Sequence, residues 1–128
     1  RLVSAILSGA KRTTTGLLAE LELEGEAPGD DVGLREVVVD SAGRPVAVTR
    51  TTEAHVVRLG DVTLEHAVAE GEGHASVAEW RAGHERFWRS DEERAWFREH
   101  GAEPPALDND TPVVCWRFEV EAQDPAVC

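Results

Sequence analysis

The sequence predicts an α+β fold, in which helices pack on a mostly antiparallel β-structure, either a curved sheet or a small β-barrel. The hydrophobic patterns follow the order helix, strands, helices, strand, and they do not form repeated βαβ units. Two β-rich runs, 34–39 and 46–52, flank a turn-forming segment that contains Gly43 and Pro45, which is typical of a hairpin. No internal repeat interrupts this order, so we expect one domain over residues 1–128.

The spacing of apolar residues predicts the N-terminal elements. Apolar side chains recur three and four positions apart in residues 2–10, which predicts a helix that ends at Gly9. The three threonines at 13–15 favour an extended strand. Apolar residues then alternate with glutamates over 19–23, which predicts a further half-buried strand, and the segment 25–31 is expected to be a loop.

Helix-capping residues and a final alternating run predict the remaining elements. Asp61 or Thr63 is expected to open a short helix that ends near Glu70. Ser76 and Ser90 are each followed three residues later by a glutamate, a spacing that predicts two further helices. The last strand is predicted from four alternating apolar residues, Val114, Trp116, Phe118 and Val120.

Composition and charge limit the partners. The chain has 25 acidic and 13 basic residues, a net charge of −12. Proteins that grip long nucleic acids usually present a basic face, so we expect a small nucleoside-type ligand or a short RNA and not long duplex DNA. No apolar run approaches the roughly 20 residues of a membrane span, and we expect no signal peptide. We therefore expect a cytoplasmic protein without a membrane partner.

The cysteines do not indicate a metal, a cofactor or a disulfide framework. Cys115 and Cys128 lie thirteen positions apart, which matches neither a metal-ligand spacing nor a disulfide pattern, so reduced thiols are expected. His84 begins half of a zinc-protease helix signature, but position 88 is tryptophan. The chain starts at Arg1 and contains no methionine, so we expect its natural start to lie upstream.

Lys11 stands out because the other twelve basic residues are all arginine. A lysine can lose its proton when it is buried, whereas an arginine stays charged. Among the lysine and arginine residues of this chain, only Lys11 can therefore act as a base. The competing interpretation is that the single lysine falls at this position by chance. We favour a functional role.

Five segments in a fixed order cover nearly the whole chain. They are Gly9-Ala10-Lys11-Arg12-Thr13-Thr14, Gly43-Arg44-Pro45 with Thr49-Arg50-Thr51-Thr52-Glu53, Ala69-Glu70-Gly71-Glu72-Gly73, Trp80-Arg81 with His84 and Phe87, and Pro112 to Phe118. Together they resemble the ASCH family, relatives of the RNA-binding PUA domains, in which a helix runs into Gly-x-Lys-x-x-Thr at the start of the first strand. The resemblance implies a PUA-like barrel.

The same resemblance implies a function. The family includes a small enzyme that hydrolyses N4-acetylcytidine to cytidine and acetate, and other members have been described as ribonucleases. By residue match the catalytic set is Lys11, Thr14 and Glu70, with Glu72 as an alternative to Glu70 because two glycines loosen the alignment. The leading hypothesis is an amidohydrolase for a modified nucleoside. The alternatives are an RNA-binding module or ribonuclease that uses the same cleft without amidase activity, and a sensor that only binds.

Chemistry is consistent with this assignment. A threonine hydroxyl needs an adjacent base to become a nucleophile, and a neutral lysine could supply it. Alternatively, Lys11 stays charged and binds a phosphate or a carbonyl. Six further residues are expected to contact the ligand: Thr13, Arg50, Glu72, Trp80, Arg81 and His84. Each also fits a structural role, since aromatic residues at helical spacing usually belong to the core.

Overall fold

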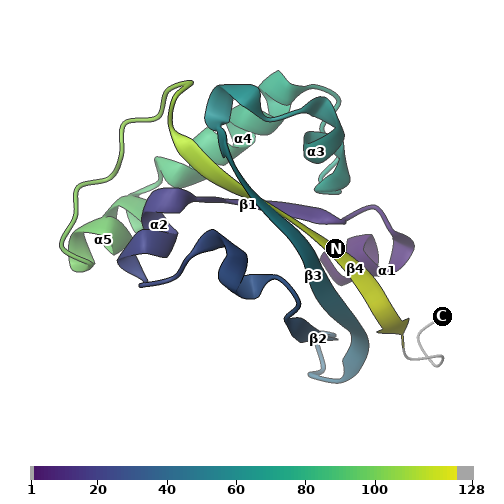
Figure 1. The fold of residues 1–128 in the computed structure, drawn as a ribbon. Helices are drawn as coiled ribbons and strands as arrows, with labels where there is room; N and C mark the ends of the chain where they lie inside the picture. The colour runs from purple at the N-terminus through teal and green to yellow at the C-terminus, as the bar shows by residue number, and fades with distance from the viewer. Residues whose placement is uncertain (1, 124–128) are drawn as a thin grey trace.

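The computed structural model describes residues 2–123, in which a four-stranded sheet curls into half a barrel (Figure 1). The strands are β1 (Thr13–Leu17), β2 (Arg35–Val39), β3 (Pro45–Arg58) and β4 (Pro112–Gln123). They lie in the order β1-β4-β3-β2, and every neighbouring pair is antiparallel. The predicted α+β class and the antiparallel, barrel-like sheet are therefore confirmed.

The connections between the strands carry the helices. These are α1 (Leu2–Ser8), α2 (Leu18–Leu23), α3 (Leu64–Ala69), α4 (Val77–Trp88) and α5 (Asp91–Glu99), with short 3₁₀ turns η1 (Pro28–Asp31) and η2 (Leu59–Asp61). The side chains of Thr63, Ser76 and Ser90 each accept a hydrogen bond from the backbone N–H three residues later, which confirms the predicted caps. Among the described helices, none has the length and apolar character needed to cross a bilayer.

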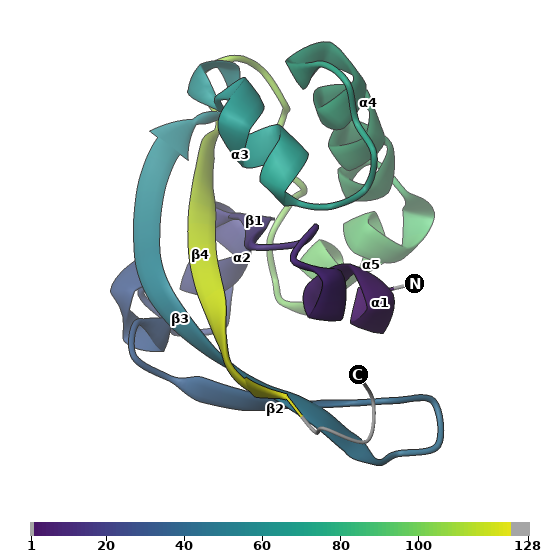
Figure 2. The ribbon, with the colours of Figure 1, turned by 90° about the vertical axis from the view of Figure 1, so that its right-hand side faces the viewer.

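The curl of the sheet comes from its two long strands. Figure 2 shows β3 and β4 bending together along their length. The pairing register of β3 with β4 shifts between Val48 and Thr49 and again between Thr51 and Glu53. Such bulges increase the local bend and twist of a strand. As a result, the edge strands β1 and β2 approach the same interior space.

The hydrophobic core lies between one face of the sheet and the helices α3, α4 and α5. Its most deeply buried members are Leu17, Leu59, Trp80, Phe97 and Val113. The aromatic residues of α4 are not all part of the core. Trp80 and Trp88 are buried, whereas Phe87 is 56% exposed and contributes little to the core.

The segment 19–23 is helical, which corrects the strand expected there. Its alternating pattern came from alanine, leucine and glutamate, which are all strong helix formers and include no β-branched residue. Leu17 and Leu21 are both buried, and their spacing of four places them on one side of a helical turn. The chain therefore leaves β1 at Leu17 and turns directly into α2.

Candidate functional site

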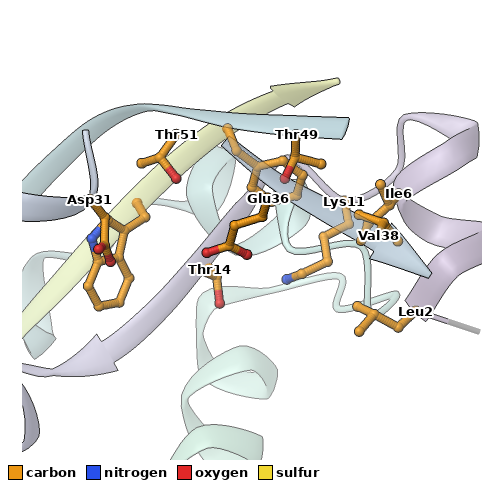
Figure 3. A pocket seen from close by; sticks show the side chains of 11 residues that line it. Leu2, Ile6, Lys11, Thr14, Asp31, Glu36, Val38, Thr49 and Thr51 are labelled. Atoms are coloured by element: carbon orange, nitrogen blue, oxygen red, sulfur yellow. The ribbon is translucent and has the colours of Figure 1, made fainter. Parts of the chain in front are cut away.

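Strand β1 separates two groups of polar side chains. Thr14 faces a cavity inside the half-barrel (Figure 3). Its neighbours Thr13 and Thr15 make hydrogen bonds on the other side of the strand, to His66 and Glu70. Successive residues of a strand point to opposite faces, so this division follows from the extended backbone of β1.

The cavity has a volume of about 300 Å³. It is lined by Leu2, Ile6, Lys11, Thr14, Asp31, Glu36, Val38, Thr49, Thr51, Trp116 and Phe118. These residues come from α1, the loop that follows it, η1 and all four strands, so both edges of the sheet contribute to one pocket. Its size lies at the lower end of the range for small-molecule sites, roughly 300–1,000 Å³.

Lys11, Thr14 and Glu36 direct their polar groups toward the same part of this cavity. Figure 3 shows the Lys11 amine, the Thr14 hydroxyl and the Glu36 carboxylate converging from three sides. The Lys11 amine also donates to two backbone carbonyls, that of Thr13 at 2.7 Å and that of Glu70 at 3.4 Å. The amine is therefore held in place from behind while it faces the ligand space.

The loop that carries Lys11 is fixed to both α1 and α3. Gly9 adopts a φ of +89° and ends α1. The Arg12 guanidinium donates to the carbonyls of Ile6 at 2.9 Å and of Lys11 at 2.8 Å. The backbone N–H of Arg12 donates to the carbonyl of Ala69 at 2.6 Å, at the end of α3. The position of the amine thus depends on two helices that are distant in sequence.

Gly71 is expected to be intolerant of substitution because it packs against this loop. It has a φ of +76°, and an added Cβ would lie 2.9 Å from backbone atoms of Ala10 and Lys11. We expect Gly71→Ala to lower the free energy of unfolding by about 2 kcal/mol, from backbone strain plus the forced shift of the loop. Urea denaturation measures this loss.

Gly73→Ala is the matched control, since Gly73 has a φ of +82° but has open space where its Cβ would be. It carries the backbone strain alone and should cost about 1 kcal/mol. Equal losses in the two variants would mean that the contact with the Lys11 loop has no energetic weight.

The carboxylate of Glu70 lies on the opposite side of β1 from Thr14, in a buried polar cluster. Glu70 is only 2% exposed. One oxygen accepts a hydrogen bond from the Thr15 hydroxyl at 2.5 Å, and the other lies 3.1 Å from Nε2 of His84. Nε2 of His66 lies 2.6 Å from the Thr15 hydroxyl and 3.5 Å from Glu70. Three side chains therefore hold this carboxylate.

The cluster favours an ion pair between Glu70 and His84. Burial opposes charge on both groups, but the hydrogen bonds from His66, His84 and Thr15 outweigh it and hold the pKa of Glu70 well below its usual value. For His84, burial acts to lower the pKa, but the hydrogen bond and charge of Glu70 raise it overall. Nδ1 of His84 lies 3.0 Å from the Trp80 carbonyl, so both N–H groups of a protonated ring have acceptors.

Cys115 borders this cluster and stays a thiol. Burial raises the pKa of Cys115 to about 11, with a further rise from the charge of Glu70 and an opposing hydrogen bond with Thr15. A thiol with such a pKa is a poor nucleophile near neutral pH. Cys115 forms no disulfide within residues 2–123, and Cys128 lies outside the described residues, so the expectation of reduced thiols stays a prediction.

Trp80 and Thr13, both expected to contact a ligand, are buried instead. Trp80 is 0% exposed and stacks on the His84 ring with a centroid distance of 4.3 Å. Thr13 is 2% exposed, and its hydroxyl donates to the carbonyl of His66 at 2.9 Å. Trp80 offers no surface to a ligand, and Thr13 only borders a separate cavity beside His66 and Cys115. His84 contacts the Glu70 carboxylate and lines another cavity with Thr15 and Glu72. These three residues support the site from behind.

The two arginines expected at the site are engaged elsewhere. Arg50 forms ion pairs with Glu119 at 3.0 Å and with Glu121 at 2.8 Å. Arg81 donates to the side-chain oxygen of Asn109 at 2.5 Å. Neither lines the cavity of Lys11 and Thr14, so the structure does not bring them to the candidate site.

Glu72 lies near Lys11, but in a second cavity. This space of about 330 Å³ is lined by Leu2, Ala5, Lys11, Glu70, Gly71, Glu72 and His74. The Glu72 carboxylate lies 3.4 Å from Nε2 of His74, and its side chain is 57% exposed. Lys11 is common to both cavities, so it lies between the Thr14 pocket and the glutamate-bearing loop.

Sequence reasoning missed three residues that the structure places at the site: Glu36, Thr15 and His66. A signal for His66 was present, because it precedes Glu70 by four residues and so shares one side of α3 with it. Thr15 lies next to Thr14 and must face the other side of the strand. Glu36 and Val38 lie two positions apart and so share the inner face of β2. This face is near Lys11 only because the sheet is curled.

Comparisons with known proteins agree with this fold. A family model described as "ASCH domain" matches residues 1–122. Among solved structures, an ASCH domain from Lactobacillus crispatus JV V101 is 28% identical with a TM-score of 0.72, and the match covers 93% of this chain and 69% of that one. A protein from Enterococcus faecalis V583 is 26% identical with a TM-score of 0.71, and the match covers 94% of this chain and 66% of that one. No curated protein matches the sequence significantly.

Proposed function

Because the chain belongs to the ASCH domain family, whose fold is PUA-like, we propose that it is an amidohydrolase for a modified nucleoside such as N4-acetylcytidine. The proposal rests on the convergence of Lys11 and Thr14 on one cavity of small-ligand size. The reaction cleaves the amide C–N bond with water and releases the free amine and acetate.

The contacts of Lys11 suit the role of a base. A neutral amine has two N–H groups and one lone pair. The carbonyls of Thr13 and Glu70 are placed to accept the two N–H groups, at 2.7 and 3.4 Å. The lone pair then faces the cavity, where it can take the proton of the Thr14 hydroxyl. A protonated amine in the same position has its third N–H available for the substrate carbonyl.

The proposed steps balance. The Thr14 oxygen attacks the acyl carbon as its proton moves to Lys11, and the protonated Lys11 returns that proton to the departing amine nitrogen as the C–N bond breaks. Water then attacks the resulting ester, which releases acetate and restores the Thr14 hydroxyl. Glu70 acts as a positioning residue here, since its carbonyl holds Lys11 and its carboxylate holds Thr15, the neighbour of Thr14.

The charges of the cavity favour a nucleoside over RNA. Its lining includes two carboxylates, Asp31 and Glu36, against the single cation Lys11. A phosphodiester backbone gains affinity from basic side chains, which this lining does not offer in excess. Trp116 and Phe118 also line the cavity and provide apolar aromatic surface on which a base can stack.

Release of cytidine from N4-acetylcytidine by the purified protein tests the proposal. We expect turnover by the wild type and a loss of at least about a thousandfold in Thr14→Ala, because the nucleophile is removed. Thr52→Ala is the matched control. Thr52 lies outside the cavity lining and bonds to the carbonyl of Arg117, so turnover should be retained. A folded wild type without turnover would contradict the proposed function, and an active Thr14→Ala would contradict the role of Thr14.

A further inference from the structure

Glu36 is an acidic residue on the cavity wall that faces Lys11 and Thr14. It lies on β2, at the opposite edge of the sheet from β1, and reaches this position because the sheet is curled. Its carboxylate lies in the same part of the cavity as the Lys11 amine and Thr14 (Figure 3). Glu36 is exposed, and within residues 2–123 its side chain forms no hydrogen bond or ion pair with another residue, so its carboxylate oxygens are available to a ligand that enters the cavity.

Lys11 and Glu36 have opposite charges but are not paired. The side-chain contacts of Lys11 in the described chain are the carbonyls of Thr13 and Glu70. Space for a ligand group therefore remains between the amine and the carboxylate. Asp31, the other carboxylate of the cavity, lies away from Lys11 in Figure 3, so Glu36 is the acid that faces the reacting groups.

A secondary amide fits this arrangement. In a trans amide the C=O and the N–H point in opposite directions in one plane. When the carbonyl lies beside Lys11 and Thr14, the N–H is directed toward the facing wall, where Glu36 lies. We propose that Glu36 determines specificity for N–H-bearing amides by accepting a hydrogen bond from the substrate amide. This inference rests on the proposed amidohydrolase function.

The proposal predicts a measurable preference. A hydrogen bond that the substrate N–H donates to a charged acceptor is expected to change affinity by at least about tenfold. An N-methylated amide cannot donate this bond. The protein should therefore bind N4-acetylcytidine at least tenfold more tightly than N4-acetyl-N4-methylcytidine.

The test is calorimetric titration of both compounds into the Thr14→Ala protein, in which turnover does not disturb binding. Adding Glu36→Gln, which keeps the size of the side chain but removes its charge, should reduce the preference to less than about threefold. Adding Glu53→Gln is the matched control. Glu53 is an exposed glutamate on β3 that lies 3.6 Å from His55 and lines a different cavity, so the tenfold preference should remain.

The outcomes separate this inference from the proposed function. An unchanged preference in Glu36→Gln would overturn the inference, as would failure of the Thr14→Ala protein to bind either compound. An inactive wild type together with a preference that depends on Glu36 would contradict the hydrolase and leave the role of Glu36 intact. Turnover of N4-acetylcytidine without any N–H preference would support the hydrolase and contradict the role of Glu36.

Discussion

Replacing Glu70 by glutamine is expected to lower the free energy of unfolding by about 3 kcal/mol, since removing one partner of a buried ion pair leaves the other charge uncompensated. Glu70 is 2% exposed, and the side chain of its partner His84 is 14% exposed. Glutamine keeps the volume and one acceptor for the Thr15 hydroxyl. It cannot neutralise a protonated His84, nor can it accept from His84 and Thr15 as strongly as a carboxylate does.

Urea denaturation of Glu70→Gln beside Glu72→Gln measures this effect. Glu72 lies two residues away, but its side chain is 57% exposed and pairs with the partly exposed His74. The same chemical change there should cost less than about 0.5 kcal/mol. Comparable losses in the two variants would show that burial of the Glu70 pair carries no special weight.

The loss of stability in Glu70→Gln is expected to change with pH in a definite direction. The pKa of His84 is raised on folding, so its contribution to stability is complete below the unfolded value of about 6.5 and is lost as the pH rises through the folded value. The pKa of Glu70 is lowered, so its contribution is present above about 4.5 and is lost only in acid. The deficit of Glu70→Gln should therefore be largest near pH 5–6 and shrink toward high pH.

Lys11→Arg is expected to lower the rate of N4-acetylcytidine hydrolysis at least about a thousandfold, which makes it the most informative active-site substitution. Arginine preserves the positive charge, but it does not lose its proton in proteins and so cannot accept one from Thr14. The comparison partner is Lys11→Met, which removes the charge and keeps a chain of similar length. If Lys11 acts as a base, both variants are inactive.

The rates must be read against the folding of each variant. Urea denaturation should place both Lys11 variants within about 1.5 kcal/mol of the wild type, because the two hydrogen bonds of the amine are to backbone carbonyls at a partly exposed position. An active Lys11→Arg beside an inactive Lys11→Met would show that a fixed charge suffices. The proton-transfer role of Lys11 would then be abandoned.

Local signals made much of the fold predictable. Thr63, Ser76 and Ser90 mark helix starts because a cap is satisfied within three residues of sequence. The approach of Lys11 and Thr14 to one cavity was equally accessible, since both lie in one short motif at the start of β1. By contrast, the strand predicted over 19–23 was wrong, because these residues alternate as in a strand but are of types that favour a helix.

Contacts that depend on the curl of the sheet were not predictable. Glu36 lines the same cavity as Lys11 only because β2 and β1, which lie at opposite edges of the sheet, are bent toward each other. The sequence also did not predict the direction in which a side chain points. Trp80 lies in one of the segments that carry the family resemblance, but that segment does not say whether the indole faces a ligand or the core. Its complete burial answers that question for this chain.

The two faces of β1 have an evolutionary consequence. Thr14 faces the cavity, whereas Thr13 and Thr15 secure the buried cluster around Glu70. On the proposed function, ligand choice and structural integrity are therefore assigned to alternate positions of a single strand. Mutations at Thr14, or at Glu36 across the cavity, can change the chemistry on offer while the folded state keeps its stability margin. Descendants of such a chain can acquire new ligands by single substitutions, without compensating changes in the core.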